Sequence, residues 1–131
     1  MKKLTEALEI DCLIAPQDVG TADVTGSYKS VVDCKRFVIC GKAGAVTAAK
    51  ILTVTPMQAQ DSAGTGAKAL GSAVTAAGAG GAAPADIEIE FQSDELDHAG
   101  GFTHVTCVLG IDENAKLGAA YLIRGERRFC P

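Results

Sequence analysis

The chain has 131 residues, which is enough for one domain but not for a cofactor domain beside a substrate domain. It carries 12 basic and 16 acidic side chains, a net charge of −4, and its aromatic residues are four Phe and two Tyr, with no Trp. This acidic balance and the shortage of stacking side chains argue against a nucleic-acid-binding protein.

No stretch of the sequence has the length and apolar character of a membrane helix, and its first six residues lack the apolar segment of a secretory signal. We therefore expect no membrane partner and a soluble protein made in the cytosol. The five cysteines show no spacing typical of a zinc site: Cys12, Cys34, Cys40, Cys107 and Cys130. Their odd number leaves at least one thiol as a buried inert residue or as a bond to another chain. We expect no metal and no cofactor.

Residues 1–25 are expected to form an N-terminal arm. An apolar alternation ends at Pro16 and consists of Leu8, Ile10, Cys12 and Ile14. This alternation fits an extended arm or an edge strand, although the spacing of Leu4 and Leu8 also fits a helix.

The rest of the chain, residues 26–131, contains short apolar runs bounded by Gly, Pro or Asp, which favour strands over helices. In the clearest run, apolar side chains alternate with Glu88 and Glu90, so that one face is buried and the other is wet. Pro56 lacks an N–H donor, so its strand should lie at a sheet edge or contain a bulge. These patterns predict an all-β domain with strands over residues 28–32, 36–40, 51–59, 86–91, 102–111 and 119–124.

Residues 63–85 are mostly Ala and Gly, and we expect them to form a long, flexible surface loop. Leu70 and Val74 permit a helical turn within residues 67–77, but the neighbouring glycines lower helix stability. A loop of this length in a small domain is usually functional or ordered by a partner, which points towards assembly.

No segment carries a recognisable catalytic motif. Residues 64–68 have neither the spacing nor the hydroxyl of a phosphate-binding loop. The polar residues at 94–98 precede two glycines and are typical of a solvated turn, and a half-buried structural role is expected for the strand residue His104. An enzyme would need one pocket built from Asp94, Asp97, His98 and His104. We predict that the protein is not an enzyme.

The C-terminal end is basic, because Arg127 and Arg128 precede Phe129 and Cys130, whereas residues 86–97 hold six acidic residues and no basic one. In a repeating assembly, the acidic edge of one subunit can pair with the basic tail of the next, and separately solvated faces are the alternative. Cys130, together with Cys12 in the arm, is our candidate for an intermolecular disulfide, with a free exposed thiol as the alternative.

Two segments in the second half of the chain resemble a known family. One is MQAQDSAGTGAKAL at residues 57–70, which follows a Thr/Val strand. The other combines ELD at 95–97, a Gly-Phe pair, a second Thr/Val strand, NAKLG at 114–118 and the basic end RRFCP. Together they are similar to small virion proteins of tailed bacteriophages, of the capsid decoration (cement) type. The Ala/Gly tract between them and the cysteines depart from that family.

This resemblance implies a β-sandwich or jelly-roll-like body and a structural role in the virion, on the outside of the capsid, after synthesis in the cytoplasm of the host bacterium. The implied partners are the major capsid protein and copies of the same chain, commonly as a homotrimer. The side chains expected to contact them are Leu8, Ile10, Ile14, Arg127, Arg128 and Phe129. The alternatives are a phage tail or head–tail connector protein and a small non-enzymatic ligand-binding module.

Overall fold

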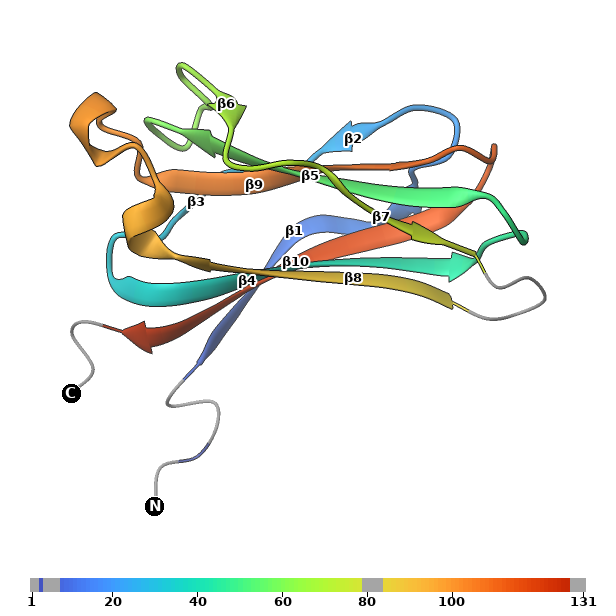
Figure 1. Cartoon of the computed structure of the whole chain (residues 1–131), viewed down its shortest axis with the longest axis horizontal. Coiled ribbons are helices and arrows are strands. Elements are labelled where there is room, and N and C mark those ends of the chain that lie inside the picture. The colour runs from blue at the N-terminus through green and yellow to red at the C-terminus, as the bar shows by residue number, and fades with distance from the viewer. Residues whose placement is uncertain (1–2, 4–7, 79–83, 128–131) are drawn as a thin grey trace.

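Two antiparallel sheets pack face to face in the structure, a computed structural model that describes residue 3, residues 8–78 and residues 84–127 (Figure 1). The first sheet has the order β1 (Glu9–Asp18), β10 (Leu117–Arg127), β4 (Cys34–Ala45) and β8 (Pro84–Gln92). In the second sheet, β9 (His104–Ile111) pairs with β5 (Ile51–Ala59) and with the short strands β2 (Val24–Thr25) and β3 (Lys29–Ser30). The other side of β5 pairs with β6 (Lys68–Ala69) and β7 (Val74–Ala77). Two 3-10 helices, η1 (Ser93–Glu95) and η2 (His98–Gly100), connect β8 to β9.

The strand pairing is nested along the chain. The first strand pairs with the last, β2 and β3 pair with β9, β4 pairs with β8, and β5 pairs with β6 and β7. A long antiparallel ribbon that folds over in this way gives a two-sheet sandwich of the jelly-roll type. The predicted all-β fold, a single β-sandwich or jelly-roll-like domain, is therefore confirmed. The described part of the chain contains no helix that is long and apolar enough to cross a membrane.

The core lies between the two sheets and is built from alternate side chains of the long strands. The Phe37 and Phe91 rings stack with their centroids 5.5 Å apart and link β4 to β8. In the second sheet, Leu52, Val54 and Leu109 are fully buried. A Cβ at Gly41 of β4 would come within 2.4 Å of the Val54 side chain, so glycine permits the close approach of the sheets at this point.

The predicted strands correspond closely to the long strands, because their alternation reports which face is buried. β5 has the predicted bounds, and β4, β8, β9 and β10 overlap the predicted ranges. The range 28–32 forms only the two-residue strand β3, and β2, β6 and β7 were not predicted. These short strands have too few residues to show an alternation, so long-range pairing alone creates them.

Pro56 lies where the neighbours of β5 are interrupted. The Pro56 carbonyl accepts a hydrogen bond from Leu70 N–H on the side where β6 and β7 lie. Since N–H and C=O of one strand residue point the same way, the missing donor of Pro56 faces the gap between β6 and β7. The predicted edge or bulge is therefore an interruption in the strands that flank β5.

The Ala/Gly-rich segment differs from the predicted loop at residues 63–85. Its described part contains β6 and β7, which pair with β5, and β8 begins at Pro84. The helical turn expected within residues 67–77 is wrong, because the backbone there forms strand pairs with β5. Residues 79–83 of the predicted flexible loop lie outside the described residues.

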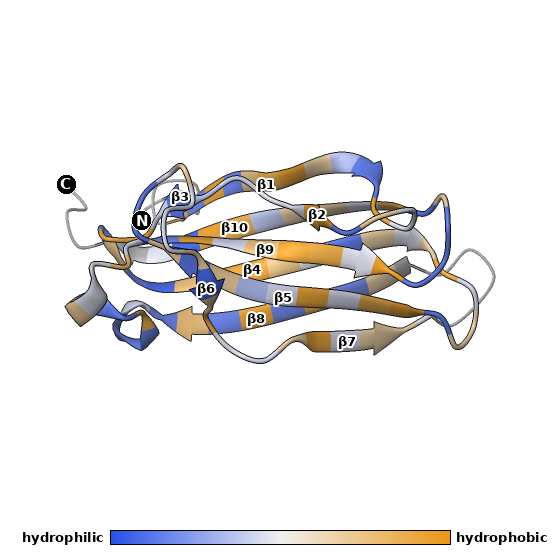
Figure 2. Cartoon of the chain, turned by 90° about the horizontal axis from the view of Figure 1, so that it is seen from above, coloured by the Kyte–Doolittle hydropathy of each residue, from blue (hydrophilic) through white to orange (hydrophobic). Residues whose placement is uncertain are grey.

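The predicted N-terminal arm at residues 1–25 is largely part of the sandwich. β1 pairs with β10 over its whole length, with two irregularities in register, and Leu13 and Ile14 are buried in the core. The edge-strand reading of this segment is the correct one. Seen from above, β1 and β7 lie on opposite long sides of the sandwich (Figure 2). Residues 1–2 and 4–7 of the arm lie outside the described residues.

One arginine holds the start of β1 in place. Arg124 of β10, with a side chain that is only 12% exposed, forms ion pairs with Glu9 and Asp11 of β1. It also donates a hydrogen bond of 2.8 Å to the Ser30 carbonyl and lies 3.9 Å from Asp33. A single guanidinium therefore connects the edge strand, the last strand and the segment between β3 and β4.

Candidate assembly surface

The outer face of the four-stranded sheet points away from the core and carries two cross-strand rows of side chains. Core residues such as Leu122, Ile39 and Ile87 point inwards, so the residues between them point outwards. The register places Ile10, Ile123, Val38 and Glu90 in one row. It places Cys12, Tyr121, Cys40 and Glu88 in the next row. We call this surface the outer face.

The half of the outer face over β1 and β10 is apolar. Ile10 is 65% exposed, and Ile123, Val38 and Tyr121 are half-buried. Apolar side chains that adjoin one another on a sheet face, beside an edge strand, are typical of an interaction surface.

A hollow of about 300 Å³ opens where β1, β10 and β4 meet on this face. Gly125 and Leu8 both line it, and a Cβ at Gly125 would lie 3.2 Å from the Leu8 side chain. The other lining residues are Arg36, Phe37, Val38, Glu90 and Ile123. We call it the Gly125 hollow, and its size and apolar lining suit one large apolar side chain.

The half of the outer face over β8 is acidic. Asp86, Glu88 and Glu90, which we call the acidic row, have side chains that are 52%, 66% and 61% exposed. Lys42 lies 3.6 Å from Asp86 and 3.4 Å from Glu88, and Arg36 lies 3.9 Å from Glu90. Three carboxylates face two cations here, so the row keeps an excess of one negative charge, and ion pairs this exposed contribute little to stability.

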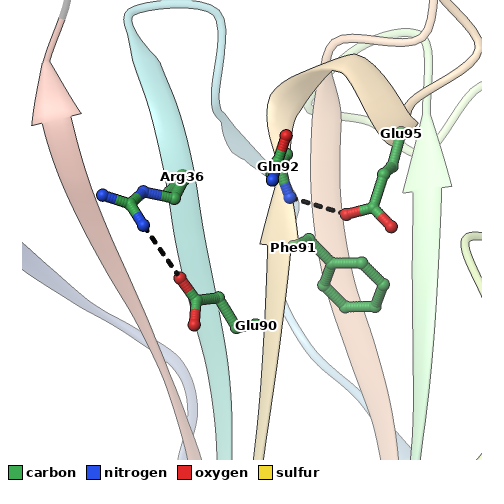
Figure 3. Close-up of a pocket in the computed structure, with 5 residues that line it drawn as sticks. All are labelled: Arg36, Glu90, Phe91, Gln92 and Glu95. Carbon is green, nitrogen blue, oxygen red and sulfur yellow. Dashed lines mark hydrogen bonds and ion pairs between the residues drawn. The ribbon is translucent and has the colours of Figure 1, made fainter.

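The acidic character continues at the end of β8, beside η1. Figure 3 shows Arg36 and Glu90 joined across two neighbouring strands, with Gln92 and Glu95 beyond them. The Gln92 N–H donates a hydrogen bond of 2.6 Å to the Glu95 carboxylate. These residues and Phe91 line a second hollow, which shares Arg36 and Glu90 with the Gly125 hollow.

The described cysteines differ in exposure and none of them forms a disulfide. Cys12 is exposed on the outer face, and Cys40 lies on the same face but is only 5% exposed. Cys34 and Cys107 are fully buried. Burial raises the pKa of the Cys107 thiol to about 12, and burial also raises the pKa of Cys40. Cys130 lies outside the described residues, so an intermolecular disulfide of Cys12 or Cys130 stays a prediction.

Thiol alkylation should follow this order of exposure. With iodoacetamide at neutral pH, we expect Cys12 to be modified first, Cys40 slowly, and Cys34 and Cys107 only after unfolding, because a buried thiol is neither accessible nor ionised. Mass spectrometry of peptides from timed quenches measures the order. Modification of Cys107 as fast as Cys12 would contradict this burial pattern.

The polar residues at 94–98 are divided among separate interactions. Asp97 accepts hydrogen bonds from Lys68 at 2.7 Å and from the Gly100 N–H, whereas His98 contacts the Ser93 carbonyl. The ring nitrogen Nδ1 of His104, the first residue of β9, lies 2.8 Å from the Thr103 hydroxyl. Asp94 lines a different hollow with Lys35, Gln92 and Ser93. The structure therefore brings Asp97 and His98 into one turn, and within the described ranges it forms no metal-holding group of three such side chains.

The lowered pKa values of two turn carboxylates, Asp97 and Asp61, predict how the stability of the fold depends on pH. The hydrogen bond from Lys68, then that from the Gly100 N–H, hold the pKa of Asp97 below its ordinary value of 3.8. Hydrogen bonds from Thr65 lower the pKa of Asp61 in the same way. Such groups stabilise the fold above their ordinary pKa, and this contribution is lost as the pH falls through the lower folded value.

We therefore expect the free energy of unfolding to fall once the pH drops below about 4, and Lys68→Met to lose part of this dependence. Urea unfolding from neutral pH down to about pH 2.5 measures both effects. An identical pH profile for Lys68→Met would contradict the role of the Lys68 hydrogen bond. Lys50→Met, which removes another exposed lysine, is the control.

The predicted contact residues fall into three groups. Ile10 is exposed and Leu8 lines the Gly125 hollow, so both lie on the candidate surface. Ile14 was wrong as a contact, because it is 2% exposed and packs in the core. Side chains of Arg127, Arg128 and Phe129 lie outside the described residues. Val38, Tyr121 and Ile123 were not predicted as contacts, since the residues on both sides of each of them in the sequence include apolar ones, which hides the alternation.

Comparison with known proteins bears on the fold. No protein-family model matches the sequence, and no match is found among curated proteins. A chain in the structure of infectious bursal disease virus, Gx strain, has a similar fold, with a TM-score of 0.50 and 11% identity. The alignment covers 92% of this chain and 32% of the viral chain, so this chain spans about a third of that neighbour's length.

A second solved structure has a weaker likeness to this chain. It belongs to Bacillus endospore appendages, described as a family of disulfide-linked pili, and aligns with a TM-score of 0.46 and 11% identity. The alignment covers 92% of this chain and 89% of the other. At such low identity the viral likeness shows a shared fold alone.

Proposed function

We propose that this protein is a structural subunit of a bacteriophage virion, which binds the outside of the capsid in many copies and stabilises the shell. The observation that carries the proposal is the outer face, where Ile10, Ile123 and Val38 of neighbouring strands form an apolar surface on the described part of the jelly roll. The shared fold with a chain from a virus structure and the resemblance of residues 57–70 to phage decoration proteins support it.

A structural role suits a surface of this kind. The exposed apolar area is modest, and a single contact of that size binds weakly. When many copies bind a symmetric shell, each copy contributes to one cooperative network, and the apparent affinity rises without any new type of contact. A cement protein needs little more than a stable body and such surfaces.

The experiment is to mix the purified protein with undecorated phage heads and to measure bound protein after sedimentation. We expect saturable binding, a raised melting temperature of the heads, and binding weakened at least about tenfold by Ile10→Lys. Val74→Lys is the matched control, because Val74 is an exposed apolar residue on β7, on the opposite side of the sandwich. Wild-type protein that does not bind heads at micromolar concentrations would refute the proposal, and protein located on tails by electron microscopy would favour the tail alternative.

A further inference from the structure

The outer face places an apolar hollow directly beside an excess of negative charge. Arg36 and Glu90 line both the Gly125 hollow and the second hollow, so the two adjoin each other. Beyond Glu90, the acidic row runs along β8 and Glu95 closes its end. A segment that fills the hollow therefore has to carry basic residues next to its apolar side chain.

Two outer faces do not complement each other. If two copies stacked about a two-fold axis across the strands, the acidic row of one copy would meet that of the other. If the axis ran along the strands, the apolar half over β1 would meet the acidic row. Both arrangements bury three carboxylates per copy against two cations, Lys42 and Arg36, and an uncompensated buried charge is costly, so stacking of this face on itself is disfavoured.

The C-terminal residues of the chain have the required chemistry. Arg127 and Arg128 precede Phe129, so two guanidinium groups adjoin one aromatic ring. Arginine binds carboxylates with two parallel hydrogen bonds, and a phenyl ring fills a hollow of the size found beside Gly125. In the sequence, no basic residue lies within the acidic stretch 86–97.

Little of the chain separates the end of β10 from Phe129. The Arg127 backbone still pairs with Cys34 on β4, and one residue separates it from Phe129. Reversal of a strand takes a loop of about two residues at least, before the chain can return along the sheet. We therefore consider Phe129 of a second copy as the occupant, and the three residue steps from Arg127 to Cys130 span about 10 Å when extended.

We propose that the C-terminal residues Arg127–Pro131 of one copy bind the outer face of the next copy, with Phe129 in the Gly125 hollow and the two arginines on the acidic row. This inference rests on the proposed function, because it names the partner of the same assembly surface. The contact joins different surfaces of the two copies, so it can close into a ring of subunits.

Charge reversal tests the proposal on the full chain. One variant carries Arg127→Glu with Arg128→Glu, and the other carries Glu88→Arg with Glu90→Arg. Sedimentation velocity under reducing conditions should show concentration-dependent association of the wild-type chain, weakened at least about tenfold in each variant alone. A mixture of the two variants should associate again, because each tail then meets a face of opposite charge. This recovery also shows that both variants are folded.

Two further variants set the controls. Asp94→Arg changes the charge on η1, off the sheet face, and should leave association unchanged. Phe129→Ala should weaken association, and Phe129→Leu should retain most of it. A wild-type chain that stays monomeric, or charge variants that associate like wild type, would overturn the inference.

A thiol readout checks the placement independently. Cys12 lies two residues along β1 from Ile10, about 6.6 Å away, and Cys130 follows Phe129 directly. With oxidised glutathione as oxidant, two thiols form one disulfide and two reduced glutathione molecules are released. We expect Cys12–Cys130 peptides between copies, lost in the Arg127→Glu/Arg128→Glu variant. Cross-links that persist in that variant would contradict the docked tail.

Head binding separates the two proposals. If the tail variant loses self-association but still binds heads, the tail contact joins subunits and is not required for binding to the shell. If the wild-type chain associates through its tail but does not bind heads, the capsid proposal fails and the tail inference stands.

Discussion

Arg124→Met should destabilise the protein by about 3–4 kcal/mol, because it leaves carboxylates in a half-buried site without their cation. The Arg124 side chain is 12% exposed and forms ion pairs with Glu9 and Asp11 while donating to the Ser30 carbonyl. Its loss should also loosen the start of β1, so that amide protons there exchange faster. Urea unfolding gives the energy, and hydrogen exchange locates the change.

Arg36→Met is the matched control. Arg36 lies 3.9 Å from Glu90, and both side chains are more than half exposed. An exposed pair of this kind contributes at most about 1 kcal/mol. If the two variants lost equal stability, the ion cluster at Arg124 would not be the feature that secures the edge strand.

Phe37→Ala should cost about 3–5 kcal/mol, because it removes a large buried ring and leaves a cavity. Phe37 is 1% exposed and stacks on Phe91, so its loss weakens both the contact between β4 and β8 and the packing between the sheets. We expect a fall of several degrees or more in melting temperature, measured by calorimetry.

Val38→Ala tests whether the loss depends on which face of β4 is changed. Val38 is the next residue along the strand, but it points to the outer face and is half-buried. Its truncation creates no internal cavity, and we expect a loss of at most about 1 kcal/mol. Equal losses for Phe37→Ala and Val38→Ala would contradict the assigned inner and outer faces.

The assembly surface could be predicted only in part. Leu8 and Ile10 were identified because they alternate with polar residues near the chain end. Ile14 belongs to the same alternation but is buried, because β1 has register shifts on both sides of it that turn its side chain into the core. An irregularity of this kind leaves no trace in a period-two pattern.

The short strands β6 and β7 also depend on contacts between distant residues. Residues 67–77 contain Ala at helical spacing, yet two stretches of them pair with β5 as β6 and β7. The intrinsic preference of these Ala and Gly residues for helix or strand is weak. The backbone of β5 offers them hydrogen bonds, and this pairing makes them strands. Pro56 then sets where these two strands break.

The all-β class, most of the long strands and the buried face of residues 86–91 could be predicted, because alternation along a strand is a local property of five to ten residues. Which strands are neighbours could not be predicted, because it depends on how the whole chain folds. That choice placed Ile123 and Val38 beside Ile10 and put the acidic row next to the Gly125 hollow. These residues are up to 113 positions apart, and the nested register between distant strands, which no local pattern encodes, brings them onto one face.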